Sequence, residues 1–165
     1  MAEYTPLVQR TLQLAKQYVG QREATGRNDG WFPRLVQRFV AKGSRWLDNQ
    51  PWCVCYATYV IHTAAKELGI KPAFPNSASS SQVYAWAKQH GKLLRAPVPG
   101  CVGLVRRGGQ GDQDGRNDAG KTHIHTFIVH DIQGTTLITT EGNYRNSVCW
   151  NKRRHPWNCD FVAIG

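Results

Sequence analysis

At 165 residues, of which 41% are apolar, the chain is long enough for one substantial hydrophobic core and leaves little for a second domain. It contains no apolar run long enough to span a membrane, and its beginning lacks the continuous apolar core of a signal peptide. The 21 basic and 11 acidic residues give a net charge of +10, so we expect attraction to polyanions such as cell envelopes or nucleic acids.

The predicted helices precede most of the predicted strands. Apolar residues recur at helical spacing behind Thr5-Pro6, which indicates an amphipathic first helix. Hydrophobic periodicity and end signals predict helices over residues 5–19, 31–42, 51–68 and 79–90. Alternating segments predict strands near residues 101–106, 123–131, 135–141 and 159–164. This order predicts an α+β fold in a single domain, residues 1–165, with the 51–68 helix packed across an antiparallel sheet.

Cys53 lies at the start of the third predicted helix, behind Pro51-Trp52. Proline is tolerated in a first helical turn because it lacks an N–H that the turn would leave unpaired. The unpaired N–H groups and the positive end of the helix dipole favour an anion, and the thiolate is the reactive form of cysteine. Cys55 lies about 200° further round the helix, so only Cys53 shares the apolar face. Cys53 is therefore a candidate nucleophile, and the alternative is an ordinary buried cysteine.

A histidine and a glutamate further along the chain are candidates for its partners. The residues around His125 alternate as in a half-buried strand, with His123 and His125 on its apolar face. Residues 135–141 also alternate, and the turn between the two segments predicts a hairpin. With a loop of Ile132-Gln133-Gly134, His125 lies directly opposite Glu141. A cysteine, a base and a residue that orients the base are the parts of nucleophilic acyl transfer.

The same residues carry a resemblance to a known family. The Pro51-Trp52-Cys53 turn, the strand segment beginning at His125, and Glu141-Gly142-Asn143 resemble the cysteine, histidine-dependent amidohydrolase/peptidase (CHAP) domains, papain-like enzymes that cut peptidoglycan. The resemblance implies a papain-like arrangement, with Cys53 as the nucleophile, His125 as the base, Glu141 as the orienting residue and Asn143 as an accessory polar group.

The resemblance covers most of the chain. Residues 18–30 are similar to the opening of one subgroup, Ser77–Ser80 to its middle and Val98-Pro99-Gly100 to its turn into the first core strand. Two positions depart from the pattern, because Cys101 stands where members often carry Asp and Ile124 where they carry Gly. The second departure leaves open whether His123 or His125 is the base.

The resulting prediction is a cysteine hydrolase that cuts an amide of peptidoglycan, either between muramic acid and the stem peptide or within the peptides. Without a signal peptide, such an enzyme needs another route from the cytoplasm to the periplasm or wall. A phage lysis enzyme released through a membrane pore satisfies this, as does an injected antibacterial effector with an immunity protein and a secretion machine as partners. The alternatives are a catalytically silent basic module that binds envelopes or nucleic acid, and a cysteine peptidase or transferase acting on protein.

Metal and cofactor chemistry are not expected. There is no Cys-x2-Cys pair, Cys53-x-Cys55 is too tight for common zinc spacings, and His123-x-His125 has no carboxylate in motif register. The loop over residues 107–121 resembles a calcium loop only superficially, at Asp112, Asp114 and Asp118, because the required glycine and final glutamate are missing.

The remaining cysteines and the basic clusters leave alternatives open. Five cysteines leave at least one unpaired within the chain. If the protein enters an oxidising compartment, Cys149 and Cys159 are expected to form a disulfide. If it originates in the cytosol, both thiols are expected to stay reduced. The clusters Arg106-Arg107 and Lys152-Arg153-Arg154 are either solvated basic surface or specific sites, and no nucleic-acid-binding signature accompanies them.

Overall fold

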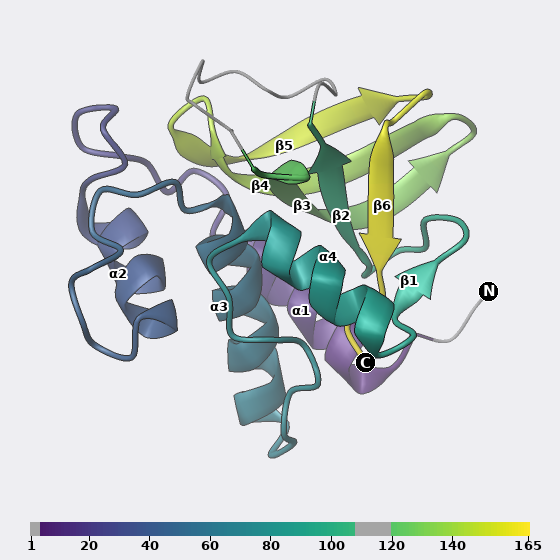
Figure 1. Ribbon diagram of the computed structural model, residues 1–165, viewed down its shortest axis with the longest axis horizontal. Helices are drawn as coiled ribbons and strands as arrows, with labels where there is room; N and C mark the ends of the chain where they lie inside the picture. Colours follow the sequence, from purple (N-terminus) through teal and green to yellow (C-terminus); the bar gives the residue numbers. More distant parts are fainter. Residues whose placement is uncertain (1–3, 108–119) are drawn as a thin grey trace.

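Four helices come first in the described part of the chain, and a sheet follows. The computed structural model describes residues 4–107 and 120–165. Its helices are α1 Pro6–Gln17, α2 Trp31–Val40, α3 Cys53–Glu67 and α4 Ser80–Gln89. Its strands are β1 Leu93–Leu94, β2 Val102–Arg106, β3 His123–Gln133, β4 Thr136–Tyr144, β5 Ser147–Arg154 and β6 Cys159–Val162. The strands pair antiparallel in the order β1-β6-β2-β3-β4-β5, which confirms the predicted α+β fold (Figure 1).

The helix ends follow signals in the sequence. Thr5 caps α1, since its Oγ1 accepts a hydrogen bond from the Val8 N–H at 3.3 Å, and Pro6 occupies the first turn. Gly69 follows the end of α3 with a φ of 67°, a left-handed conformation that favours glycine. The observed helices are slightly shorter than the predicted ranges because those ranges include capping residues.

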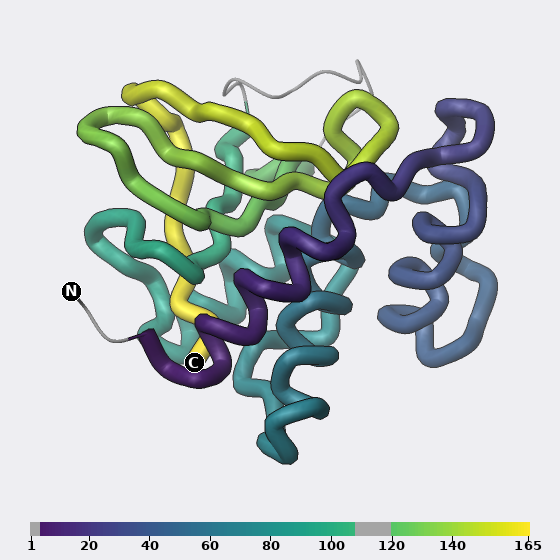
Figure 2. Tube along the Cα trace, turned by 180° about the vertical axis from the view of Figure 1, so that it is seen from behind, coloured from purple at the N-terminus to yellow at the C-terminus, as the bar shows by residue number. Residues whose placement is uncertain are grey.

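Helix α3 is the central helix of the fold. It packs against α1 and α2, and it also packs against β3 and β4, as predicted for this helix (Figure 1). From behind, α1 is seen crossing the molecule beside α3, and the end of the chain returns to the start of α1 (Figure 2). The first turn of α3 is thereby held against the sheet.

Strand β3 is buried on both faces, whereas the sequence predicts a half-buried strand. Ile128 joins the main core, which the helices share, and the Thr126 hydroxyl lies 2.8 Å from that of Ser80 on α4. Phe127 and Val129 point to the opposite face, where they form a second apolar cluster. The alternation of residues in the sequence therefore assigns the side chains of β3 to the correct faces, but both faces are buried and neither is exposed to solvent.

The sequence does not predict β1 and β5. Strand β1 has only two residues, too few for a periodic signal. Strand β5 pairs with β4 along nearly its whole length, although it ends in Lys152-Arg153-Arg154, which resembles a solvated surface. Because of these charged residues, the sequence pattern does not indicate a strand, although alternate residues of β5 face inward.

The β3–β4 hairpin has a shorter turn than predicted. Gln133 pairs with Thr136, so the turn consists of Gly134 and Thr135, and Gly134 has the left-handed φ of 59°. The predicted three-residue loop is therefore wrong, and so is the register that it implied.

A bulge at His130 restores the face of the glutamate. The register shifts there, after which Ile128 pairs with Thr140, and the continued register puts Glu141 opposite Phe127. The prediction that Glu141 lies directly opposite His125 is thus wrong. Because strand side chains alternate, Glu141 still shares the face of His125 and reaches it diagonally. Without the bulge, Glu141 would point toward the helices.

Candidate active site

Cys53 is the first residue of α3, and the turn before it is fixed on two sides. Trp52 is fully buried, and its Nε1 donates a hydrogen bond to Glu23 Oε1 at 2.9 Å. Gln37 donates to the carbonyl oxygen of Gln50 at 2.7 Å. These two contacts hold the thiol in a defined position, where it is 5% exposed and lines a groove.

His125, near the beginning of β3, lies between the thiol and a carboxylate. Its Nε2 is 2.8 Å from Glu141 Oε2. The Cys53 thiol is a second hydrogen-bond partner of the ring, and Nδ1 is the ring nitrogen left for it. The structure therefore brings together the cysteine, histidine and glutamate that the sequence singles out.

His123 has both of its ring nitrogens engaged by other groups. Its Nε2 is 2.9 Å from Asp160 Oδ2, and its Nδ1 is 2.9 Å from Thr122 Oγ1. Its ring stacks on Tyr84 at a centroid distance of 4.4 Å. A ring held in this way has no nitrogen left to take a proton from the Cys53 thiol, so the geometry favours His125 as the base.

The Glu141 carboxylate is completely buried and accepts hydrogen bonds on both oxygens. Oε1 accepts from Thr139 Oγ1 at 2.7 Å, Asn151 Nδ2 at 3.0 Å and Arg153 Nε at 2.7 Å. Oε2 accepts from Arg153 Nη2 at 2.6 Å and lies beside the His125 ring. The carboxylate is thus fixed by strands β3, β4 and β5 together.

These contacts set the charges of the site. Burial lowers the pKa of His125, but hydrogen bonds with Cys53 and Glu141 raise it by more, to about 9. Burial raises the pKa of Glu141, whereas hydrogen bonds and charge interactions with His125 and Arg153 lower it well below its usual range. At neutral pH the geometry therefore favours an imidazolium next to an ionised carboxylate.

Arg153, which the sequence leaves open as solvated surface, belongs to this buried network. Its side chain is 8% exposed. The missing signal was the period of two in β5, because Arg153 and Asn151 share one face of that strand, and Asn151 pairs with Thr139. Once β5 is known, this alternation places Arg153 on the face of Glu141.

Asn143, the predicted accessory residue, lies two residues beyond Glu141. The register between β4 and β5 shifts here, and Asn143 has a φ of 58°. Its side chain is partly exposed. Its part in the reaction stays a prediction.

A groove of about 550 Å³ opens beside the thiol. The first turn of α3 and the start of α4 form part of it, and Trp46 and Lys121 lie along it. Lys121 is the lysine among its described lining residues, and none of those residues is an aspartate or glutamate. Trp46 is 67% exposed, and it therefore offers an aromatic surface along the groove.

The structure also describes the remaining cysteines and the potential metal ligands. Cys149 and Cys159 are free thiols, as are the other cysteines. In residues 4–107 and 120–165, no group of three His, Cys, Asp or Glu side chains is placed to hold a metal ion. The calcium-like positions Asp112, Asp114 and Asp118 lie outside the described residues. No helix of the described part is long and apolar enough to cross a membrane.

Comparison with known proteins identifies structural neighbours. No family model and no curated protein matches the chain. Two solved structures share its fold: the crystal structure of Ly7917 with the hydrolyzing product of MDP, and the crystal structure of Ly7917. Both are 13% identical to this chain with a TM-score of 0.52, and they cover 96% and 94% of it. The chain spans 63% and 62% of their length, less than two thirds. The CHAP resemblance therefore rests on the residue motifs.

Proposed function

We propose that this protein is a cysteine hydrolase that cleaves an amide bond of peptidoglycan. The observation that carries the proposal is the His125 ring, which lies between the Cys53 thiol and the buried Glu141 carboxylate at the edge of a groove. The substrate class is supported by the neighbour Ly7917, which was solved with a hydrolysis product of MDP, a peptidoglycan fragment. The motif resemblance to CHAP domains supports the same class.

In the proposed reaction, the Cys53 thiolate attacks the amide carbonyl carbon and forms a tetrahedral oxyanion. The His125 imidazolium gives its Nδ1 proton to the amide nitrogen, the C–N bond breaks and the amine leaves. Water then attacks the thioester while His125 takes one of its protons. The C–S bond breaks, the acid is released, and the thiolate–imidazolium pair is restored. Glu141 keeps the ring in orientation throughout.

The proposal assigns two donors to the oxyanion of the intermediate. The Cys53 N–H belongs to the first turn of α3, whose N–H groups have no acceptor within the helix. In the proposal it points to the oxyanion, and the Asn143 side chain is the second donor. This assignment gives a function to the accessory residue that the motif implies.

The groove supports a substrate that carries both sugar or peptide surface and negative charge. Trp46 provides a stacking surface, and Lys121 provides a cation. Carboxylates of stem peptides are the negative groups that peptidoglycan offers. The scissile amide is either the bond between muramic acid and the stem peptide or a bond within the peptides.

The cellular setting is part of the proposal. The enzyme is made in the cytoplasm and acts in the periplasm or wall, as a phage lysis enzyme or as an antibacterial effector. In the second case, an immunity protein and a secretion machine are its partners.

Purified wall sacculi test the proposal. Wild-type protein is expected to release fragments whose masses identify the bond, and Cys53→Ala is expected to release none. Cys55→Ala is the matched control, because Cys55 lies on the same helix, is fully buried and has a pKa that burial raises to about 12. Sacculi that bind the folded protein but stay uncut would contradict the proposal and favour the silent basic module. Equal activity of both variants would exclude Cys53 as the nucleophile.

A further inference from the structure

Arg153 is a buried arginine whose guanidinium binds the Glu141 carboxylate. Its Nε and Nη2 donate to the two oxygens of Glu141 at 2.7 and 2.6 Å. Its guanidinium carbon lies 4.5 Å from the centroid of the Phe127 ring, so the ring covers the ion pair. Such a fork fixes a carboxylate in orientation as well as in charge.

The arginine completes a row of four ionisable groups. Cys53, His125, Glu141 and Arg153 follow one another through direct contacts, and each of the four side chains is buried. With a thiolate and an imidazolium, their charges alternate and cancel. Buried charges are tolerated where they are paired in this way.

We propose that Arg153 is a positioning residue that balances the charge of Glu141, so that the His125 imidazolium stays available to stabilise the Cys53 thiolate. This inference rests on the proposed catalytic assignment. In this inference Arg153 acts through Glu141, and it is not among the described residues that line the groove.

The direction of the effect follows from the charges. Without Arg153, one imidazolium faces two anions in a buried site. The surplus negative charge then favours protonation of the thiolate, while Glu141 holds the imidazolium more strongly. The thiolate that iodoacetamide alkylates is then disfavoured. Removal of the Glu141 charge together with Arg153 restores the balance between the thiolate and the imidazolium.

The test is the pH dependence of Cys53 alkylation by iodoacetamide, located by peptide mass spectrometry. Arg153→Met is expected to move the rise in rate by about one pH unit or more toward alkaline pH, which is about tenfold slower labelling near pH 6. Arg153→Lys keeps the charge without the fork and is expected to move the profile by less. Arg154→Met is the matched control, since Arg154 is the exposed neighbour, and its profile should match the wild type.

The double variant Glu141→Gln/Arg153→Met separates charge balance from packing. It carries two neutral side chains in place of the ion pair. It is expected to label near pH 6 faster than Arg153→Met or, if that variant does not fold, than Arg153→Gln. A folded Arg153→Met protein with the wild-type profile would overturn the inference, as would a folded double variant with no such recovery.

This measurement needs no wall substrate. If the profile shifts as expected while sacculi stay uncut, the proposed function fails and the role of Arg153 stands. If sacculi are cut and the profile does not move, the role of Arg153 fails alone.

Discussion

Two histidines of β3, two residues apart, have the same kind of primary partner. The Nε2 of each lies beside a carboxylate oxygen, and in each case an arginine holds that carboxylate with two hydrogen bonds: Arg106 holds Asp160 for His123, and Arg153 holds Glu141 for His125. The second ring nitrogen distinguishes them. That of His123 meets a hydroxyl, whereas His125 meets the thiol. The partner of this second nitrogen therefore makes His125, rather than His123, the candidate base.

The two histidines should respond differently to substitution. His125→Ala is expected to abolish turnover, because the thiol loses its only described basic partner. His123→Ala is expected to raise KM with a smaller change in kcat, since His123 lines the groove. Steady-state kinetics on soluble wall fragments separates the two effects. The reverse order of severity would assign the base to His123.

Glu141→Gln should be nearly as damaging as Glu141→Ala. Both carboxylate oxygens accept hydrogen bonds, from Thr139, Asn151 and Arg153 and beside the His125 ring. A glutamine turns one acceptor into an NH2 group that faces donors, and it leaves the buried Arg153 without an anion. Turnover is expected to fall at least a hundredfold, about 3 kcal/mol in activation free energy. Near-normal turnover of the glutamine variant would show that the carboxylate charge is not needed.

At the scale of elements, the site depends on a close approach of α3 to β4. A Cβ at Gly142, next to Glu141, would lie 2.6 Å from the Tyr56 Cβ, which belongs to the helix that carries Cys53. No flexible side chain can move aside there. The absence of a side chain at Gly142 therefore sets the distance between the nucleophile and its partners.

Gly142→Ala is expected to push α3 from β4 and to reduce activity more than stability alone explains. Turnover should fall at least tenfold at a temperature where the variant is still folded. Gly100→Ala is the control, because its Cβ would meet Val8 at 2.3 Å, at a residue outside the groove lining, in a backbone with a φ of 87°. It should lower the unfolding midpoint without a matching loss of turnover in the folded protein. Equal behaviour of the two variants would argue against a geometric role for Gly142.

The elements were predictable where local signals are strong. Periodicity and caps located all four described helices, and proline and tryptophan before Cys53 located the start of α3. The turn length and the bulge at His130 were not predictable, because both depend on pairing between strands rather than on local propensity. Glu141 was still assigned to the correct face since the two errors in register changed its position by an even number of residues.

The burial of Arg153 also could not be predicted from local sequence patterns. Its burial depends on a carboxylate twelve residues earlier in the sequence and on a strand that local patterns did not reveal. An arginine in a basic run resembles solvated surface until the partner across the sheet is known.

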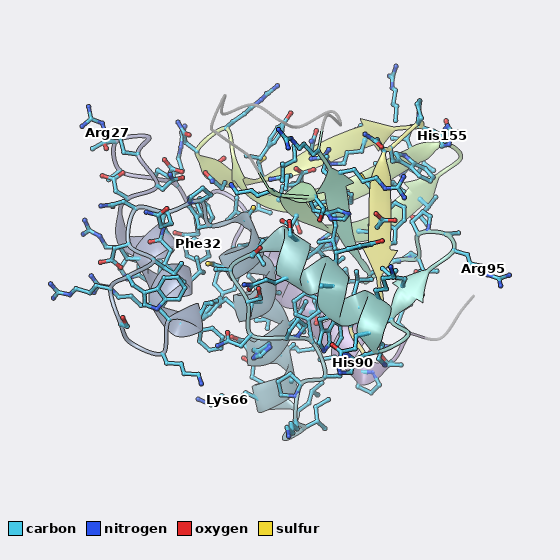
Figure 3. All side chains as sticks on the ribbon, viewed as in Figure 1. Arg27, Phe32, Lys66, His90, Arg95 and His155 are labelled. Atoms are coloured by element: carbon cyan, nitrogen blue, oxygen red, sulfur yellow. The ribbon has the colours of Figure 1, made fainter. Side chains whose placement is uncertain are left out.

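At the scale of the whole molecule, the positive charge is spread around the surface. Arg27, Lys66 and Arg95 project from different sides of the molecule (Figure 3). With a net charge of +10, this distribution favours long-range attraction to an anionic envelope from any approach direction. Lys121, in the described lining of the groove, then adds a local attraction for an anionic group next to the thiol.

Two buried histidines link the stability of the folded protein to pH. Burial lowers the pKa of His130, to about 4, so the unfolded chain binds more protons below pH 6.5 and stability falls toward acid. His125 has the opposite sign. Its pKa is raised to about 9, so its stabilisation is complete below pH 6.5 and is lost as the pH rises through 9.

Thermal unfolding between pH 6.5 and 8.5 tests the pairing of His125 with Cys53. The buried thiols of Cys55, Cys101 and Cys159 have pKa values raised by burial to about 12, so their stabilisation is lost only above the ordinary thiol pKa of about 8.5. In the proposed thiolate–imidazolium pair the thiolate offsets the loss from His125, because the folded pair holds one proton, as the unfolded cysteine and histidine do together. The stability of the wild type is therefore expected to stay nearly constant over this window. A loss on the order of 2 kcal/mol in the wild type, absent from a folded His125→Asn control, would mean that Glu141 holds the imidazolium without a thiolate.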